Sequence, residues 1–297
     1  MTEIPFTPPG PMPFRLLLDE ALRLTRRHFR TIYPAVAIPV AVVSTLFASF
    51  QVTWLSKAMG NLGSTQLFTS PRYWLVVFVS LGLVIVANNA LQAAAVSAVN
   101  GVPVDMKRAW GFTFQPRVLL TLVLWYALVF ASLFCCCLPL LVVGPLLIFV
   151  PVVMIDEGRF GLQAVSRSTD LTRHKPPAGW GESPIVKAFL LLFVGVLLAY
   201  LVGIIVAIPF QLPMYIDTFR KAAAGQDVGQ GMSSWMWLQV PAQFLNTLAS
   251  MAVYLYLSFG TALLFYDTRG RIEGTDLRAE IESSFPFPAP PPGEPRF

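Results

Sequence analysis

Five long stretches of the chain contain no Asp, Glu, Lys or Arg, and each has at least 26 residues. A bilayer core about 30 Å thick needs roughly 20 apolar residues of helix, so every stretch is long enough to cross a membrane. Charged residues make up only 12% of the 297 residues, about half of their share in soluble domains. We therefore expect an all-α, polytopic membrane protein. A soluble globular domain, a disordered chain and a nucleic-acid-binding protein are excluded.

One of these stretches, 118–155, is long enough for two spans. Its 38 residues would make about 57 Å of helix, nearly twice the membrane thickness. Pro139 and the pair Gly144-Pro145 also favour a turn within it. We therefore expect a helical hairpin there and one span in each other stretch. The six predicted spans are about 32–55, 74–97, 118–137, 142–155, 185–208 and 240–265.

The distribution of positive charge tests this count. With the N-terminus in the cytoplasm, six spans place 17 of the 21 Lys and Arg residues on the cytoplasmic side. A single crossing by 118–155 would divide them almost evenly. Because cytoplasmic loops of membrane proteins carry the excess of Lys and Arg, the hairpin is favoured and both termini are expected in the cytoplasm.

The domain organisation follows from the spans. We expect one membrane domain over 14–283, preceded by a Pro-rich segment, 1–13, and followed by a disordered Pro-rich tail, 284–297. Each pair of spans follows a short amphipathic cytoplasmic helix. The tripeptide Leu24-Thr25-Arg26 in the first of these helices recurs as Leu171-Thr172-Arg173 in the third. This suggests three repeated units, with chance similarity as the alternative.

The first amphipathic helix is predicted over Phe14–Arg30, with apolar residues on one face and arginines opposite. A basic amphipathic helix beside a span attracts anionic lipid. In the alternative interpretation its apolar face packs on the cytoplasmic ends of the spans. The arginines expected to contact anionic headgroups are Arg23, Arg26, Arg27 and Arg30.

Polar side chains within the predicted spans form a second group of candidates. They are Asn88, Asn89 and Gln92 in the second span and Gln243 and Asn246 in the last. Hydrogen bonding between helices is one interpretation, and a polar groove for a lipid headgroup or a small solute is the other. The adjacent Cys135, Cys136 and Cys137 are expected to be small packing residues. His28 and His174 have no partners at metal-ligand spacing, so no metal or cofactor is expected.

Charged residues also gather where the predicted spans leave the membrane. Charges beside lipid are costly unless they are paired, so they could form one network at the inner membrane surface. Ordinary headgroup-level charge that orients the spans is the alternative. The candidate residues are Asp156, Glu157, Arg167, Arg269, Arg271 and Glu273.

Short motifs at these junctions resemble a known family. They are Leu18-Asp19-Glu20-Ala21-Leu22-Arg23-Leu24, Val153-Met154-Ile155-Asp156-Glu157-Gly158 and Phe265-Tyr266-Asp267-Thr268-Arg269-Gly270. Together they resemble the bacterial membrane-domain family named for glycerophosphodiester phosphodiesterases, over roughly 14–280. The resemblance implies a six-span module of the bacterial inner membrane. A catalytic barrel takes about 250 residues, so we expect the membrane region alone, without that barrel.

These features bear on three possible functions. We expect a non-enzymatic module for the assembly, anchoring or scaffolding of envelope proteins, with a membrane or cytoplasmic protein as its partner and no nucleic acid. A lipid or small-solute binding or transport module is the alternative. An intramembrane enzyme is disfavoured, because no acid–base pair lies within a predicted span.

Overall fold

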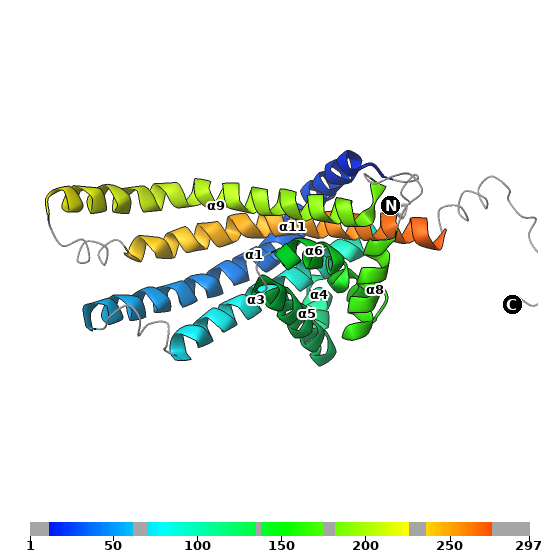
Figure 1. Cartoon of the computed structure of the whole chain (residues 1–297), viewed down its shortest axis with the longest axis horizontal. Helices are drawn as coiled ribbons and strands as arrows, with labels where there is room; N and C mark the ends of the chain where they lie inside the picture. The colour runs from blue at the N-terminus through cyan, green and yellow to red at the C-terminus, as the bar shows by residue number, and fades with distance from the viewer. Residues whose placement is uncertain (1–11, 62–70, 135–137, 175–181, 226–235, 275–297) are drawn as a thin grey trace, which may run out of the picture.

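The computed structural model describes residues 12–61, 71–134, 138–174, 182–225 and 236–274, and within these ranges it is helical without strands. The predicted all-α fold is therefore confirmed. Four helices are long and apolar enough to cross a membrane, which indicates a membrane-embedded protein. They lie along the long axis of the molecule (Figure 1) and are α1 (Phe14–Asn61), α3 (Pro71–Val99), α9 (Pro184–Ala223) and α11 (Gln239–Glu273).

Shorter helices gather around one end of these four. Asp105 caps the first of them, because its carboxylate accepts the backbone N–H groups of Lys107 and Arg108. Helices α4 and α5 bend by 68° at their junction, and the pair counts as a fifth candidate span. These helices are α4 (Met106–Thr113), α5 (Pro116–Phe134), α6 (Leu138–Leu146), α7 (Val150–Asp156) and α8 (Leu162–Arg173), whereas the 3₁₀ turn η2 (Met236–Leu238) directly precedes α11.

The structure differs from the prediction in the second half of 118–155. The expected span 142–155 is divided between α6 and α7, of nine and seven residues. The backbone between them forms 3₁₀-type hydrogen bonds, in which an N–H group donates to the third preceding residue, such as Ile148 N–H to the carbonyl of Pro145. This break follows from the prolines, which lack the donor that a continuous helix needs. The four long helices and the bent pair give up to five spans, so a sixth span and three repeated units stay predictions.

The segment nevertheless returns to the end of the bundle from which it starts. The backbone N–H of Gly161, which follows α7, donates to the Thr121 hydroxyl near the start of α5 at 2.8 Å. Gly158 and Gly161 have φ angles of 64° and 62°, in the left-handed region that glycine adopts at little cost. These two glycines therefore turn the chain from α7 into α8.

The first helix is longer than predicted. Helix α1 runs without interruption from Phe14 to Asn61, so the expected helix Phe14–Arg30 and the span 32–55 form one element. No Gly or Pro separates them, and Pro34 and Pro39 are accommodated inside the helix. Its apolar face is buried in the protein core, with Leu17 and Ala21 fully inaccessible.

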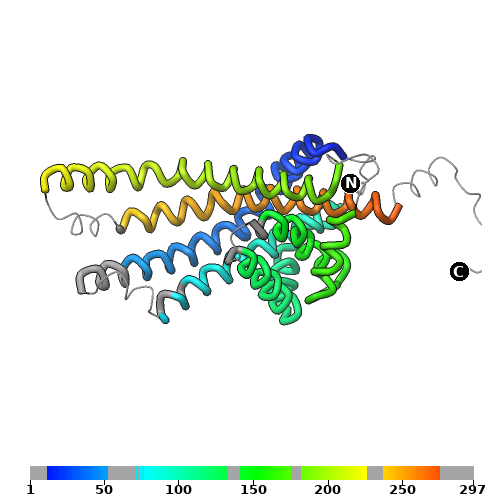
Figure 2. Tube along the Cα trace, viewed as in Figure 1, coloured from blue at the N-terminus to red at the C-terminus, as the bar shows by residue number. Residues whose placement is uncertain are grey.

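The core is built on the first and last long helices, which pack along each other (Figure 2). The Tyr33 hydroxyl of α1 donates to the backbone carbonyl of Leu248 in α11 at 2.9 Å. About three turns further along α1, the hydroxyl of Ser44 lies 3.1 Å from that of Thr247 in α11. Because water is absent from a bilayer core, such bonds between helices satisfy polar groups that would otherwise stay unpaired.

Helices α9 and α11 pack closely through two glycines. A Cβ on Gly195 of α9 would lie 2.5 Å from Leu257 Cδ1 of α11, and one on Gly260 of α11 would lie 2.9 Å from Leu191 Cδ1 of α9. Each helix therefore presents a leucine to a glycine of the other. We call this arrangement the reciprocal glycine–leucine contact. Small residues at such positions allow helix backbones to approach closely in membranes.

Some predictions fall on residues outside the described ranges. These are the cysteines 135–137, most of the segment 1–13 and the Pro-rich tail 284–297. The predicted domain boundaries therefore stay predictions.

Candidate functional site

The main candidate site lies where α7, α8 and α11 meet. Asp156 is the last residue of α7, and Glu157 follows it as the C-cap. Helix α8 places Arg167 opposite them, and the last turns of α11 carry Arg269 and Glu273. The Gly158 and Gly161 turn folds α8 back onto α7, which brings charges distant in the sequence into contact.

Ion pairs link these residues continuously. Asp156 Oδ2 lies 2.5 Å from Arg269 Nη1, and the Tyr266 hydroxyl donates to Asp156 Oδ1 at 2.5 Å. Arg269 Nε also donates to Glu273 at 2.8 Å. Arg167 donates to Glu273 in turn. We call this set, together with Glu157, the junction network.

Glu157 is the most deeply placed carboxylate of the junction network. Its side chain is 7% exposed and lies 3.0 Å from Arg167 Nε and 3.1 Å from Arg159 Nε. Burial alone lowers the pKa of Arg167, but hydrogen bonds and charge from Glu157 and Glu273 outweigh burial and leave that pKa above its ordinary value. Arg167 therefore stays charged and holds two carboxylates in place.

Arg271 does not join the junction network, although it was expected there from the sequence. Its guanidinium lies 3.0 Å from Asp267 Oδ2 and 3.3 Å from Glu182 Oε2. Residues four apart share a helix face and residues two apart do not, so Asp267 and Arg271 face away from Arg269 and Glu273. The grouping of Arg271 is corrected accordingly.

This second cluster has a buried lysine at its centre, and we call it the lysine cluster. Lys187 of α9 is 1% exposed, and its Nζ lies 2.8 Å from Glu182 Oε2 and 3.6 Å from Asp267 Oδ2. It also donates to the backbone carbonyl of Met12 at 2.6 Å, while Met12 N–H donates to Asp267 Oδ1 at 3.0 Å. The lysine cluster therefore ties Met12, two residues before the start of α1, to α9 and α11.

Lys187, Glu182 and Asp267 were not among the site residues expected from the sequence. A signal was present, since Lys187 is the third residue of the predicted span 185–208 and a charge inside a span is unusual. The hydrogen bond from Lys187 lowers the pKa of Glu182; burial opposes this change, and Arg271 adds to the lowering. The pKa of Glu182 is thus below its ordinary value, and its carboxylate stays charged.

The polar residues of the spans fall into two separate groups. On α3, Asn89 is 2% exposed and donates to the Thr113 hydroxyl at 3.1 Å. The side-chain oxygens of Asn88 and Gln92 are buried without a partner among the described residues. On α11, Gln243 and Asn246 line a groove against α9 instead. The structure therefore does not bring all five into one groove.

The basic face of α1 lies on the surface of the protein. Arg23, Arg26, Arg27 and Arg30 are exposed, and Arg23 pairs with Glu20 at 2.7 Å. The apolar face of the same helix packs into the core, as the alternative interpretation expected. Contact of these arginines with anionic lipid stays a prediction.

The chemistry available at this end of the bundle is electrostatic. Among the described residues no group of three or more His, Cys, Asp or Glu side chains could hold a metal ion. The carboxylates of both clusters face Lys or Arg at ion-pair distance. Comparison of the chain with family models, curated proteins and solved structures found no match.

Proposed function

We propose that the chain is a non-enzymatic integral membrane protein that serves as an assembly, anchoring or scaffolding module for other envelope proteins. The observation that carries this proposal is the pair of charged clusters at one end of the bundle, which fix α7, α8, α9 and α11 against each other. A surface that is already fixed binds a partner with less loss of conformational freedom. Carboxylates held as charged ion-pair partners also suit a structural role better than proton transfer.

The topology proposed with this function puts the clustered end in the cytoplasm of a bacterium. Met12, Glu157 and Arg271 lie at that end together, and the positive-inside rule favours the cytoplasmic side of the inner membrane for their segments. Single cysteines at Ser64 and Ser166, in a chain without the native cysteines, test this topology. An impermeant thiol reagent should label the first and not the second on intact spheroplasts. Equal labelling of both would refute the topology.

The same proposal includes the family. The junction motifs support membership of the membrane-domain family named for glycerophosphodiester phosphodiesterases, with six spans and three repeated units. The role proposed for this chain is that of the membrane region, so we expect no hydrolysis of glycerophosphodiesters by the purified protein. Metal-dependent hydrolysis that disappears when Asp156 or Glu157 is changed would refute the non-enzymatic assignment.

The partner surface is proposed on the outward sides of α4 and α8. Phe114 and Leu162, at the end of α4 and the start of α8, are 60% and 71% exposed at the clustered end of the bundle. Large apolar side chains beside charged groups are typical of protein contact sites. We therefore infer a protein partner that covers these two residues.

Photocrosslinking in native membranes tests the partner surface. A photoreactive phenylalanine analogue at Leu162 or Phe114 should yield a discrete protein adduct, which mass spectrometry then identifies. The matched control is Phe193 of α9, which is 56% exposed in a predicted span and should yield lipid adducts only. Adducts at Leu162 and Phe114 that resemble those at Phe193 would refute the assembly role.

A further inference from the structure

A groove between α9 and α11 lies well away from the charged clusters. Its volume is about 580 Å³, within the range of small-molecule sites. At 1.5 Å per residue, Tyr200 lies about 20 Å and Met214 about 40 Å along α9 from Lys187. A bilayer is about 40–45 Å thick with its headgroups, so the groove spans the half of the membrane opposite the clusters.

The local sequence of α9 explains why a groove forms here. Ala199, Gly203 and Ala207 recur at intervals of four and all line the groove, so α9 contributes little side-chain volume along this row, while larger side chains of α9 such as Tyr200 and Gln211 border it. A Cβ on Gly203 would lie 3.5 Å from Asn246 Oδ1. The reciprocal glycine–leucine contact holds the two helices together nearer the clusters. Beyond it, the space between them is left open.

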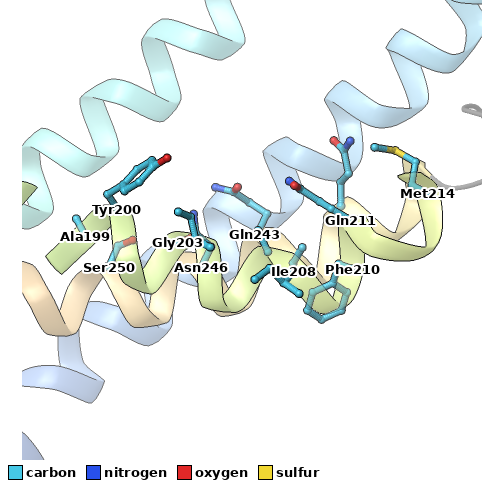
Figure 3. Close-up of a pocket in the computed structure, with 14 residues that line it drawn as sticks. Ala199, Tyr200, Gly203, Ile208, Phe210, Gln211, Met214, Gln243, Asn246 and Ser250 are labelled. Atoms are coloured by element: carbon cyan, nitrogen blue, oxygen red, sulfur yellow. The ribbon is translucent and has the colours of Figure 1, made fainter. Parts of the chain in front are cut away.

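The groove is lined by neutral polar groups. Four amides (Gln211, Gln239, Gln243 and Asn246) and two hydroxyls (Tyr200 and Ser250) face it, and none of its described lining residues is charged. Figure 3 shows the side chains of Tyr200, Gln211 and Gln243 projecting to one side of the two helices. Amides both donate and accept hydrogen bonds. Such a lining matches a ligand whose groups also do both.

One of these amides lacks a partner. Asn246 Oδ1 is buried and accepts no hydrogen bond among the described residues. A buried carbonyl oxygen without a donor costs roughly 1–3 kcal/mol in proteins, and no bulk water reaches the bilayer core to replace that donor. Gln243 turns instead to Thr247 of its own helix, at 3.4 Å. The free acceptor therefore points to a donor supplied by a bound molecule.

The surroundings of the groove indicate where that molecule comes from. In the most apolar 18-residue stretch of α9, only 11% of the residues are buried inside the protein. Ile204 and Ile208, which line the groove, are 38% and 52% exposed. These side chains would meet acyl chains in a bilayer. A ligand reaching the groove from this side needs an apolar part as well as a polar one.

We propose that the groove between α9 and α11 takes in the uncharged, hydroxyl-bearing headgroup of a membrane lipid from the membrane surface near Met214 and holds it near the middle of the bilayer, where a headgroup hydroxyl donates to Asn246 Oδ1 opposite Gly203. The other amides complete the hydrogen bonds of the headgroup, and its acyl chains lie along Ile204 and Ile208. A phosphate would find no cation among the described lining residues, so an anionic headgroup is disfavoured. This binding site is independent of the assembly role.

Photolabelling of the full chain in phosphatidylcholine nanodiscs tests the proposal. The probe is a trace of monoglucosyl-diacylglycerol with a photoreactive group on its acyl chain. We expect labelled peptides from 199–214 and 239–250. Unlabelled monoglucosyl-diacylglycerol should compete, whereas phosphatidic acid and free glucose should not. Competition by free glucose would show that the ligand of the groove is a soluble polyol and not a lipid. Equal competition by phosphatidic acid would show that the groove binds acyl chains without recognising the headgroup. Either result overturns the proposal.

Variants make the test specific to the groove. Asn246→Leu should reduce labelling about threefold to tenfold, as expected for the loss of one hydrogen bond. Gln243→Leu provides a second variant if Asn246→Leu does not fold. Gln92→Leu is the matched control, since its side-chain oxygen is also buried and unpaired but lies on α3. Labelling that falls equally in all three variants, or in none of them, would refute the assignment of the groove.

Discussion

Replacing Lys187 by Met offers the sharpest test of the lysine cluster. Methionine keeps a long unbranched side chain but removes the charge and every donor. The bond to the Met12 carbonyl, at 2.6 Å, is lost, and Met12 is only 2% exposed, so water cannot readily replace it. A hydrogen bond from a charged group contributes about 1.5–3 kcal/mol.

The other two partners of Lys187 limit the cost. Asp267 keeps its ion pair with Arg271 at 3.0 Å, and Glu182 is 35% exposed and can be hydrated. The loss therefore stays below the 3–5 kcal/mol typical of an isolated buried pair. We expect Lys187→Met to lower the free energy of unfolding by about 2–3 kcal/mol. Changing Glu182 to Gln in the same chain should recover part of this loss, because the remaining Asp267–Arg271 pair is neutral.

A matched control lies at the other end of the same helix. Lys221 Nζ is 2.7 Å from Asp217 Oδ2, but the lysine is 29% exposed. Exposed pairs four residues apart contribute about 0.3–0.5 kcal/mol. Thermal unfolding in detergent should therefore show a fall in Tm of about 4–10 °C for Lys187→Met, and of less than about 2 °C for Lys221→Met. Equal shifts for the two variants would refute the reasoning from burial.

Three further predictions concern the junction network, helix packing and pH. Glu157→Gln should destabilise the detergent-solubilised protein by about 1–3 kcal/mol, and Glu273→Gln should also lower its Tm. If thermal melts of both variants at low salt match wild type, the junction network does not stabilise the protein, and its charges only orient the spans. Gly195→Ala should cost about 1–3 kcal/mol, because a methyl group would overlap Leu257, whereas Gly82→Ala, with nothing within 4 Å, should be neutral or stabilising by up to about 1 kcal/mol; similar unfolding curves would contradict the close packing. The pKa of Glu182 is lowered from 4.5 on folding. The contribution of Glu182 to the free energy of unfolding is therefore complete above pH 4.5 and is lost as the pH falls below that value. Glu182→Gln should reduce the acid-dependent loss of stability that unfolding experiments measure between pH 5 and 3.

The sequence was most informative where a single physical rule governs the chain. A long run of residues without charge is typical of a buried helix or a membrane helix. The positions of α1, α3, α9 and α11 could therefore be predicted from charge alone. Their ends were less well predicted. Helix α9 continues from the expected end at 208 to Ala223, past Pro209 and Pro213. The thickness of the bilayer sets the minimum length of a span, but it does not determine where the helix ends beyond the membrane surface.

The clusters could be predicted in part. Charges beside lipid must pair, so their gathering at span ends followed from the sequence, and the spacing within α11 would have separated Arg271 from Arg269. The partners contributed by Met12 and Glu182 could not be inferred, because they depend on which helices pack together. The groove has the same origin. Gln243 and Asn246 were visible as polar residues, but Tyr200 and Gln211 become their neighbours only through the pairing of α9 with α11.

The lysine cluster also constrains the order in which the protein can be completed during synthesis. Met12 is bound by Lys187 and Asp267, which are 175 and 255 residues further along the chain. The ribosome delivers one partner at the start and the other near the end, at about 5–20 residues per second. For at least ten seconds, therefore, the start of α1 must wait at the membrane without its final contacts. A chain released before α11 would leave Lys187 without Asp267, a defect that quality-control proteases would recognise.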